Sequence, residues 1–76
     1  MTLFKRYERI PGHPIFEHVA ETGSLEQAQK LAKWHGTGRY VLTRDHEPPR
    51  GDQDPYIAAR LSVQPDRRVR VTERRP

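Results

Sequence analysis

The sequence predicts an α+β fold: an antiparallel sheet in the order strand, strand, helix, strand, strand, strand, with the helix packed on one face. Several segments alternate apolar and polar residues with period two, which is typical of half-buried strands. One segment, residues 25–35, repeats apolar residues at helical spacing instead. A chain of 76 residues has room for one small two-layer domain, so we expect a single domain over residues 1–76.

The first two strands are predicted at Leu3–Ile10 and Ile15–Glu21, with the turn Pro11–Pro14 between them. A short connection favours an antiparallel pair. Thr22 and Gly23 end the second strand.

The helix is predicted over Leu25–His35. Ser24 and Gln27 have the spacing of a capping box, in which each side chain satisfies a free backbone amide of the other residue. Gly36 and Gly38 then supply the C-cap and a loop. The residues expected to face the sheet are Leu25, Ala28, Leu31, Ala32 and His35.

The remaining strands are predicted at Arg39–Arg44, Ile57–Val63 and Arg68–Arg74. The segment Asp45–Pro55 between them is rich in proline and charge, so we expect a mobile, solvated loop. We expect the tail, residues 74–76, to be frayed.

The last two strands should form a hairpin with one apolar and one basic face. Pairing apolar with apolar residues across the hairpin requires an odd-length loop or a bulge, so we expect three residues, Pro65–Arg67, in the connection. That register places Val63 opposite Val69, Leu61 opposite Val71, Ser62 opposite Arg70 and Arg60 opposite Thr72. The apolar face would carry Ile57, Ala59, Leu61, Val63, Val69 and Val71, and the basic face Arg60, Arg68, Arg70 and Arg74.

The net charge of the chain is +4 and its pI is about 10. Arginine outnumbers lysine by eleven to three, and its planar fork suits phosphate and carboxylate groups. A GC-rich genome would give the same bias. There is no cysteine, which excludes a disulfide framework and a thiolate zinc site. No apolar stretch reaches transmembrane length, so we expect a cytoplasmic protein without a membrane partner.

Two surfaces are candidate binding sites. On the sheet, Arg60, Arg68 and Arg70 could meet an anionic partner, or could be a solvated edge that prevents strand aggregation. The basic track could be extended by Lys5, Arg6, Arg9 and Arg50.

The second surface is on the helix, where Lys30, Lys33 and Trp34 lie away from the apolar stripe. A tryptophan beside lysines is typical of an interface anchor or a base-stacking site. The alternative is that Trp34 folds over the edge of the core.

The sequence favours neither catalysis nor metal binding. The four histidines share no ligand spacing, and Asp52-Gln53-Asp54 would need further ligands to hold a cation. The tripeptide Arg50-Gly51-Asp52 matches an integrin-binding motif, but so short a match occurs by chance. We find no nucleophile elbow and no phosphate loop, and we expect a protein that is not an enzyme and needs no metal or cofactor.

The segment Ser24–Ala32, with the strand after it and the final hairpin, resembles small anti-CRISPR proteins of phages and mobile elements. The resemblance is to the ninth class acting on type I-F systems, whose helix has a Ser-Leu-x-Gln-Ala opening followed by basic residues. Lys30 occupies one of these basic positions, and Gln29 replaces the other. The chain departs from the family in its longer loop before the last hairpin, its arginine content and its N-terminal segment, which leaves the subtype open and I-C a candidate.

The resemblance implies a non-enzymatic inhibitor that binds the backbone subunits of a type I surveillance complex (Cascade) and blocks target DNA. It also implies nonspecific contact with duplex DNA through basic residues of the helix. Two alternatives stay open. One is a small DNA- or RNA-binding domain of a phage or plasmid regulator, and the other is an interaction subunit of a larger assembly.

Overall fold

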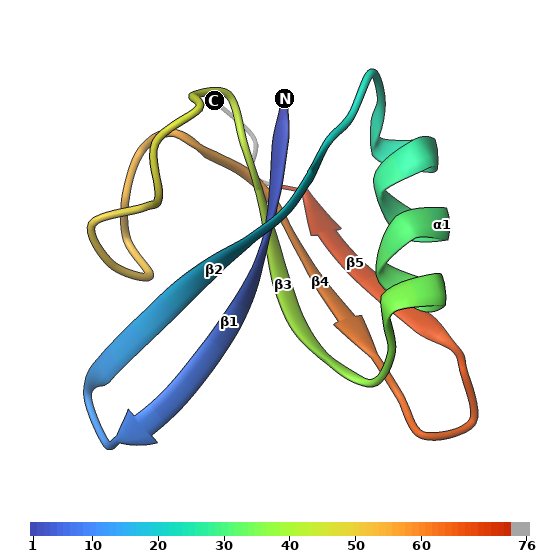
Figure 1. Cartoon of the computed structure of the whole chain (residues 1–76), viewed down its shortest axis with the longest axis horizontal. Coiled ribbons are helices and arrows are strands. Elements are labelled where there is room, and N and C mark those ends of the chain that lie inside the picture. Colours follow the sequence, from blue (N-terminus) through green and yellow to red (C-terminus); the bar gives the residue numbers. More distant parts are fainter. Residues whose placement is uncertain (74–76) are drawn as a thin grey trace.

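The computed structural model describes residues 1–73, which form one helix and a five-stranded antiparallel sheet (Figure 1). The predicted α+β class and the order of elements are confirmed. Arg74 and the tail, residues 74–76, lie outside the described residues. The elements are β1 (Thr2–Ile10), β2 (His13–Glu21), α1 (Leu25–His35), β3 (Gly38–Thr43), β4 (Ile57–Val63) and β5 (Val69–Glu73).

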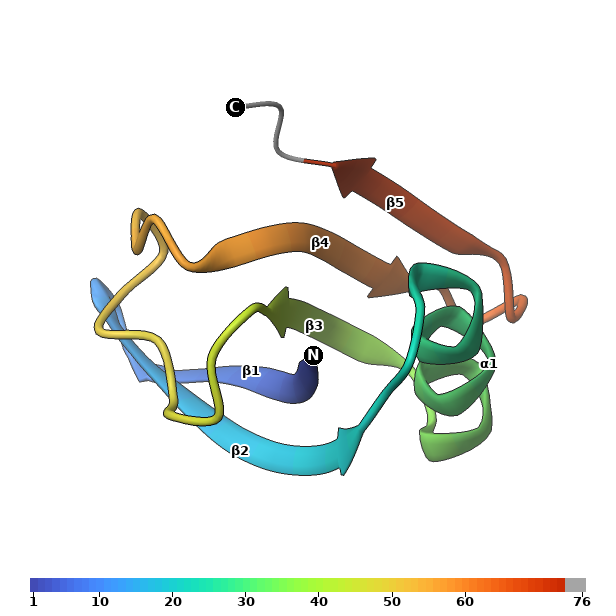
Figure 2. The same cartoon turned by 90° about the horizontal axis from the view of Figure 1, so that it is seen from above.

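The strand order in the sheet is β2-β1-β3-β4-β5. The hairpins β1–β2 and β4–β5 therefore flank the central strand β3, which pairs with β1 on one side and with β4 on the other. Helix α1 packs on β3 and β4, and the connection between these two strands lies on the opposite side of the sheet (Figure 2). Within residues 1–73, no helix is long and apolar enough to cross a membrane.

The turn between β1 and β2 is shorter than expected, because His13 and Pro14 already belong to β2. Only Pro11 and Gly12 connect the strands, and Gly12 has φ +83°, a backbone conformation that glycine adopts at little cost. The amide of Gly12 donates a hydrogen bond of 2.8 Å to the Glu8 carboxylate. This short turn sets the register of the first hairpin.

Helix α1 has the bounds that the sequence predicts. The Ser24 hydroxyl accepts a hydrogen bond from the Gln27 amide at 3.1 Å. The capping box predicts that the Gln27 side chain accepts a hydrogen bond from the Ser24 amide. It accepts instead from the amide of Gly23, one residue earlier, at 2.6 Å, so this part of the prediction is wrong. At the other end, the Gly36 amide donates to the Ala32 carbonyl at 3.0 Å. Both ends of the helix thus have partners for their free backbone groups.

The main core lies between α1 and the sheet. Ala28 and Ala32 are fully buried, and their small side chains let the helix backbone lie close to the strands. Leu31 and Leu25 are partly buried at the border. The sheet contributes Leu3, Tyr40, Leu42, Ala59, Leu61 and Val63 to this cluster, with Val69 and Val71 packed against it.

A second apolar cluster lies on the other face of the sheet. It contains Phe4, Val41 and Ile57, with Phe16 packed against them. The prediction that Ile57 faces the helix is therefore wrong. The register between β3 and β4 shifts after Leu42, which opposes Ala59, so that Thr43 opposes Ile57. This bulge turns Ile57 away from the helix.

The predicted register of the β4–β5 hairpin is confirmed at all four named pairs. Its loop is Pro65–Arg67, closed by hydrogen bonds between the backbones of Gln64 and Arg68 at 2.8 Å and of Arg67 and Gln64 at 2.9 Å. Arg67 has φ 68°, the left-handed conformation that ends a three-residue hairpin loop. An arginine therefore occupies a position that usually favours glycine.

The loop between β3 and β4, residues 44–56, is slightly longer than predicted. It is closed by a hydrogen bond of 2.9 Å from the Arg44 amide to the Tyr56 carbonyl. The Asp54 carboxylate accepts hydrogen bonds from the amides of Arg50 at 2.8 Å and Tyr56 at 2.9 Å. Pro49 is buried. The loop has a defined conformation, and its mobility stays a prediction.

Candidate functional site

A row of arginines crosses the face of the sheet that α1 leaves uncovered. Arg6 of β1 pairs with Arg39 of β3, Arg39 pairs with Ser62 of β4, and Ser62 pairs with Arg70 of β5. Residues directly opposite in antiparallel strands point to the same face. With a strand spacing of about 4.8 Å, the row from Arg6 to Arg70 is about 14 Å long.

Arg60 adds a fourth guanidinium in the neighbouring row, where it pairs with Val41 on one side and Thr72 on the other. It is therefore a diagonal neighbour of both Arg39 and Arg70. Diagonal neighbours lie about 7–8 Å apart, within reach of long side chains. We call the surface formed by Arg6, Arg39, Arg60 and Arg70 the arginine face.

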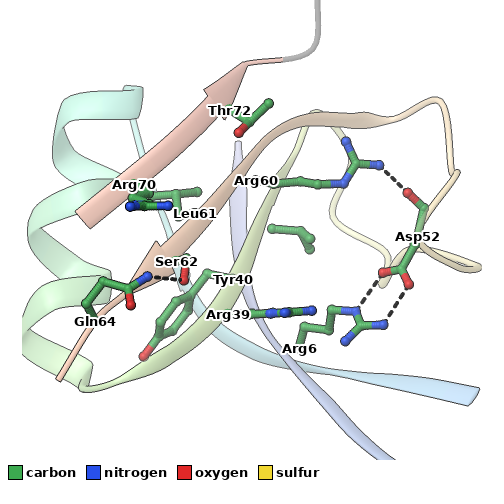
Figure 3. Close-up of a pocket in the computed structure, with 11 residues that line it drawn as sticks. Arg6, Arg39, Tyr40, Asp52, Arg60, Leu61, Ser62, Gln64, Arg70 and Thr72 are labelled. Atoms are coloured by element: carbon green, nitrogen blue, oxygen red, sulfur yellow. Dashed lines mark hydrogen bonds and ion pairs between the residues drawn. The ribbon is translucent and has the colours of Figure 1, made fainter. Parts of the chain in front are cut away.

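The arginine face borders an open pocket of about 490 Å³ (Figure 3). Ser62, Thr72 and Gln64 complete its polar lining, and the side-chain amide of Gln64 donates a hydrogen bond to the Ser62 hydroxyl at 3.0 Å. Asp52 enters the pocket from the loop 44–56, which brings an acidic group to the basic strands.

Asp52 makes the closest contacts on this face. Its carboxylate accepts hydrogen bonds from Nε and Nη2 of Arg6, each at 2.7 Å. Arg60 donates from Nη2 to the backbone carbonyl of Asp52. Figure 3 shows Asp52 between these two guanidinium groups. The pair with Arg6 has the bidentate geometry of a strong ion pair.

The charges on this face lower the pKa of Asp52 below its ordinary value. The hydrogen bonds from Arg6 contribute most, and the positive charges of Arg6, Arg60 and Arg39 add to the effect, against the opposing effect of burial. The same hydrogen bonds raise the pKa of Arg6. Asp52 is therefore a carboxylate, and Arg6 a cation, across the physiological pH range.

The arginine face keeps an excess of positive charge. Asp52 and Glu8 are the acidic side chains in ion-pair range of its arginines among residues 1–73, and Glu8 lies 3.5 Å from Arg6. Four guanidinium groups thus meet two carboxylates. Arg39 and Arg70 are exposed and have no ion pair or side-chain hydrogen bond in the described part of the chain. These two cations are available to an external anion.

The structure brings together Arg60 and Arg70, as predicted, but it does not place Arg68 beside them. Arg68 precedes β5, at the closing position of the hairpin, and its Nε lies 3.3 Å from the Asp66 carboxylate. It lines a separate hollow together with Lys30 and Lys33 of α1. The prediction that Arg68 shares a surface with Arg60 and Arg70 is therefore wrong.

The helix surface formed by Lys30, Lys33 and Trp34 is exposed. Trp34 has an exposed fraction of 85%, so the alternative that it folds over the core edge is wrong. Lys30 lies 3.9 Å from Glu26, one turn earlier on the same helix. The helix surface is thus a second candidate site, on the other side of the sheet from the arginine face.

Sequence reasoning missed Arg39 and Asp52, and it placed Lys5 wrongly. Lys5 faces the helix side, where its Nζ lies 5.3 Å from the ring centroid of Tyr7 and 5.8 Å from that of Tyr40. Because Tyr40 and Leu42 face the helix, the period-two alternation of β3 assigns Arg39 to the opposite face of the sheet. Arg9 and Arg50 do not line the pocket. No local pattern indicates Asp52, because it reaches Arg6 across 46 positions.

Three of the four histidines have structural partners. Nδ1 of His35 lies 3.3 Å from the hydroxyl of Tyr40, which donates a hydrogen bond of 2.6 Å to the Gly36 carbonyl. Burial raises the pKa of Tyr40, which keeps it a donor. His18 and His46 each lie 3.6 Å from the Glu21 carboxylate. Among residues 1–73, no group of three or more His, Cys, Asp or Glu side chains is arranged to hold a metal ion.

Comparison with known proteins gives no guide to function. No protein-family model, curated protein or solved structure matches this chain. The functional inference therefore depends on the chemistry of the arginine face and of the helix surface.

Proposed function

We propose that this chain is a non-enzymatic binding module whose arginine face binds the phosphate backbone of duplex DNA in the cytoplasm of a bacterial host. The observation that carries this proposal is the register of the sheet. It places Arg6, Arg39, Arg60 and Arg70, from four different strands, on the face of the sheet opposite α1.

Phosphate chemistry suits this face better than a neutral ligand does. A guanidinium group can donate two parallel hydrogen bonds to one phosphate. The row of about 14 Å spans roughly four nucleotides of one strand, at about 3.4 Å each. Ser62 and Thr72 add small polar groups that can donate to phosphate or sugar oxygens. Such contacts fix position on the backbone and carry little sequence information.

The test is a titration of the protein into a fluorescently labelled 20-base-pair duplex at salt concentrations between 50 and 200 mM. The expected result is an affinity that falls steeply as salt rises, because bound arginines release counterions from the DNA. An affinity that does not change with salt, or no binding at 50 mM salt, would contradict the proposal. A single strand of the same length, run in parallel, shows whether the face prefers the duplex.

A second candidate function is supported by the exposure of Trp34. A largely exposed tryptophan flanked by Lys30 and Lys33 is typical of a protein-docking anchor. On this reading the chain is an inhibitor that docks through the helix surface on the backbone subunits of a type I surveillance complex, as the resemblance to anti-CRISPR proteins implies. The arginine face, on the other side of the sheet, would then lie toward the path of the target DNA.

Co-elution on a sizing column with purified type I complexes of several subtypes, without DNA, tests this second function. A stable complex with one subtype that Trp34→Ala abolishes would support it. Separate elution from every complex would contradict it and leave direct DNA binding. If one acidic protein stabilises the chain and duplex DNA does not, the remaining reading, an interaction subunit of a larger assembly, is favoured instead.

A further inference from the structure

The carboxylate of Asp52 occupies a site on the arginine face that fits an anion. Both of its oxygens accept hydrogen bonds from Arg6 at 2.7 Å, and Arg60 donates to its backbone carbonyl. A phosphodiester group also presents two oxygens to a guanidinium fork. The contact between Asp52 and Arg6 thus shows that the site accepts a bidentate oxyanion.

We propose that Asp52 is a built-in competitor of nucleic acid, and that a backbone phosphate displaces its carboxylate from Arg6 on binding. Arg6 and Arg60 then form a phosphate subsite that the loop 44–56 covers in the free protein. This inference rests on the proposed function, because it concerns the regulation of the same face.

The burial of the two partners indicates which of them moves. The Arg6 side chain is only 12% exposed and extends from the middle of β1, whereas the Asp52 side chain is 40% exposed on a loop. A largely buried guanidinium is costly without an anionic partner, but a half-exposed carboxylate can turn into water. The cation is therefore fixed in the sheet, and the anion is the exchangeable partner.

The hydrogen bonds of the loop 44–56 allow Asp52 to move away from Arg6 while the base of the loop stays folded. The base is closed by the hydrogen bond between Arg44 and Tyr56 and by the Asp54 carboxylate, which accepts from the amides of Arg50 and Tyr56. Asp52 lies in the turn between Gly51 and Asp54, which a backbone hydrogen bond of 3.2 Å closes. A rotation of this turn that also breaks the hydrogen bond from Arg60 to the Asp52 carbonyl would free Arg6.

The variant Asp52→Asn removes the competing charge and keeps the size of the side chain. A half-exposed ion pair restrains the free state only weakly, so the affinity for duplex DNA should rise roughly fivefold. The matched control is Asp66→Asn, which makes the same charge change in the hairpin turn next to Arg68. Its affinity should stay within roughly twofold of the wild-type value, because the contribution of a distant exposed charge is screened by salt.

The experiment measures the fluorescence anisotropy of the labelled 20-base-pair duplex with the wild-type chain and both variants at 100 mM salt. Tighter binding by Asp52→Asn alone supports the inference. Equal tightening by both variants, or no change in Asp52→Asn while the wild type binds, overturns it and leaves the proposed function intact. If none of the three proteins binds the duplex, both the inference and the proposed function fail.

Amide hydrogen exchange on the wild-type chain gives a second readout that needs no variant. Addition of the duplex should speed exchange at Asp54, whose amide donates to the carbonyl of Gly51, and should leave the amide of Ala28 in the helix unchanged. Slower exchange at Asp54 in the complex would mean that the loop closes onto the DNA, which contradicts displacement. Addition of polyglutamate serves as a control, and an equal effect at the same charge concentration would contradict specificity for phosphate.

Discussion

Replacing Arg39 and Arg70 together with glutamine removes the two cations of the arginine face that have neither an ion pair nor a side-chain hydrogen bond among residues 1–73; Arg60 donates to the Asp52 carbonyl, and Arg6 pairs with Asp52 and Glu8. Both side chains are exposed, and glutamine keeps much of their length and polarity. We therefore expect the free energy of unfolding to change by no more than about 0.5 kcal/mol. The formal net charge of the chain falls from +4 to +2.

The expected effect on DNA binding follows from the number of neutralised phosphates. If all four arginines contact phosphates of a duplex, the slope of log K against log salt concentration is about −3.6, from −0.9 for each contact. Affinity then falls about 150-fold between 50 and 200 mM salt. The double variant retains Arg6 and Arg60, so its slope should be about −1.8, and its affinity should fall only about 12-fold over the same range.

The assay is fluorescence anisotropy with the labelled 20-base-pair duplex at four salt concentrations. The control is the double variant Lys30→Gln and Lys33→Gln on the helix surface, which makes the same change in net charge. Its slope should equal that of the wild-type chain. If the two double variants lower the slope equally, net charge and not the geometry of the sheet determines binding, and the reasoning from register is refuted.

Three further predictions concern stability, measured by urea or thermal denaturation. The folded-state pKa of Asp52 lies below its ordinary value of 3.8, so its ionised form stabilises the fold above that pH, and the contribution is lost as the pH falls through the folded-state pKa. At pH 7 the free energy of unfolding of the wild-type chain should exceed that of Asp52→Asn by about 1 kcal/mol or less, because the pair is partly exposed, and the difference should shrink as the pH falls below 3.8; a difference that does not change with pH would contradict this. Ser24→Ala removes the cap hydrogen bond to Gln27 and should cost about 1 kcal/mol, whereas an unchanged urea midpoint would show that the cap is dispensable. Arg67→Gly removes the steric cost of a left-handed backbone conformation at arginine, and this gain should exceed the entropy that glycine adds to the unfolded chain. Tm should therefore rise by a few degrees, whereas a lower Tm would show that the arginine side chain stabilises the turn.

Local patterns in the sequence predict much of this fold. The helix bounds follow from Ser24 at one end and Gly36 at the other, and the register of the last hairpin follows from pairing Val63 with Val69. Each of these features depends on residues a few positions apart. The sequence therefore predicts Arg60 and Arg70 as neighbours on one face, which the structure confirms.

Other features depend on contacts between distant segments and had no local signal. The position of Ile57 depends on a bulge opposite β3. Arg68 leaves the basic face because it lies at the closing position of the hairpin, before β5 begins. Arg39 joins the site through the pairing of β3 with β1 and β4. Asp52 reaches Arg6 only when the loop 44–56 folds over the sheet. Period-two alternation assigns a residue to a face, but it does not say which strands are neighbours.

The position of β3 between the two hairpins has a consequence for folding and for protein engineering (Figure 1). Each hairpin closes over a loop of two or three residues and can form early, whereas β3 must join partners that are separated from it by the helix or by the loop 44–56. The surface that carries Arg6, Arg39, Arg60 and Arg70 exists only after this last step. A peptide that contains either hairpin alone holds at most half of these arginines, and so neither hairpin reproduces this surface by itself.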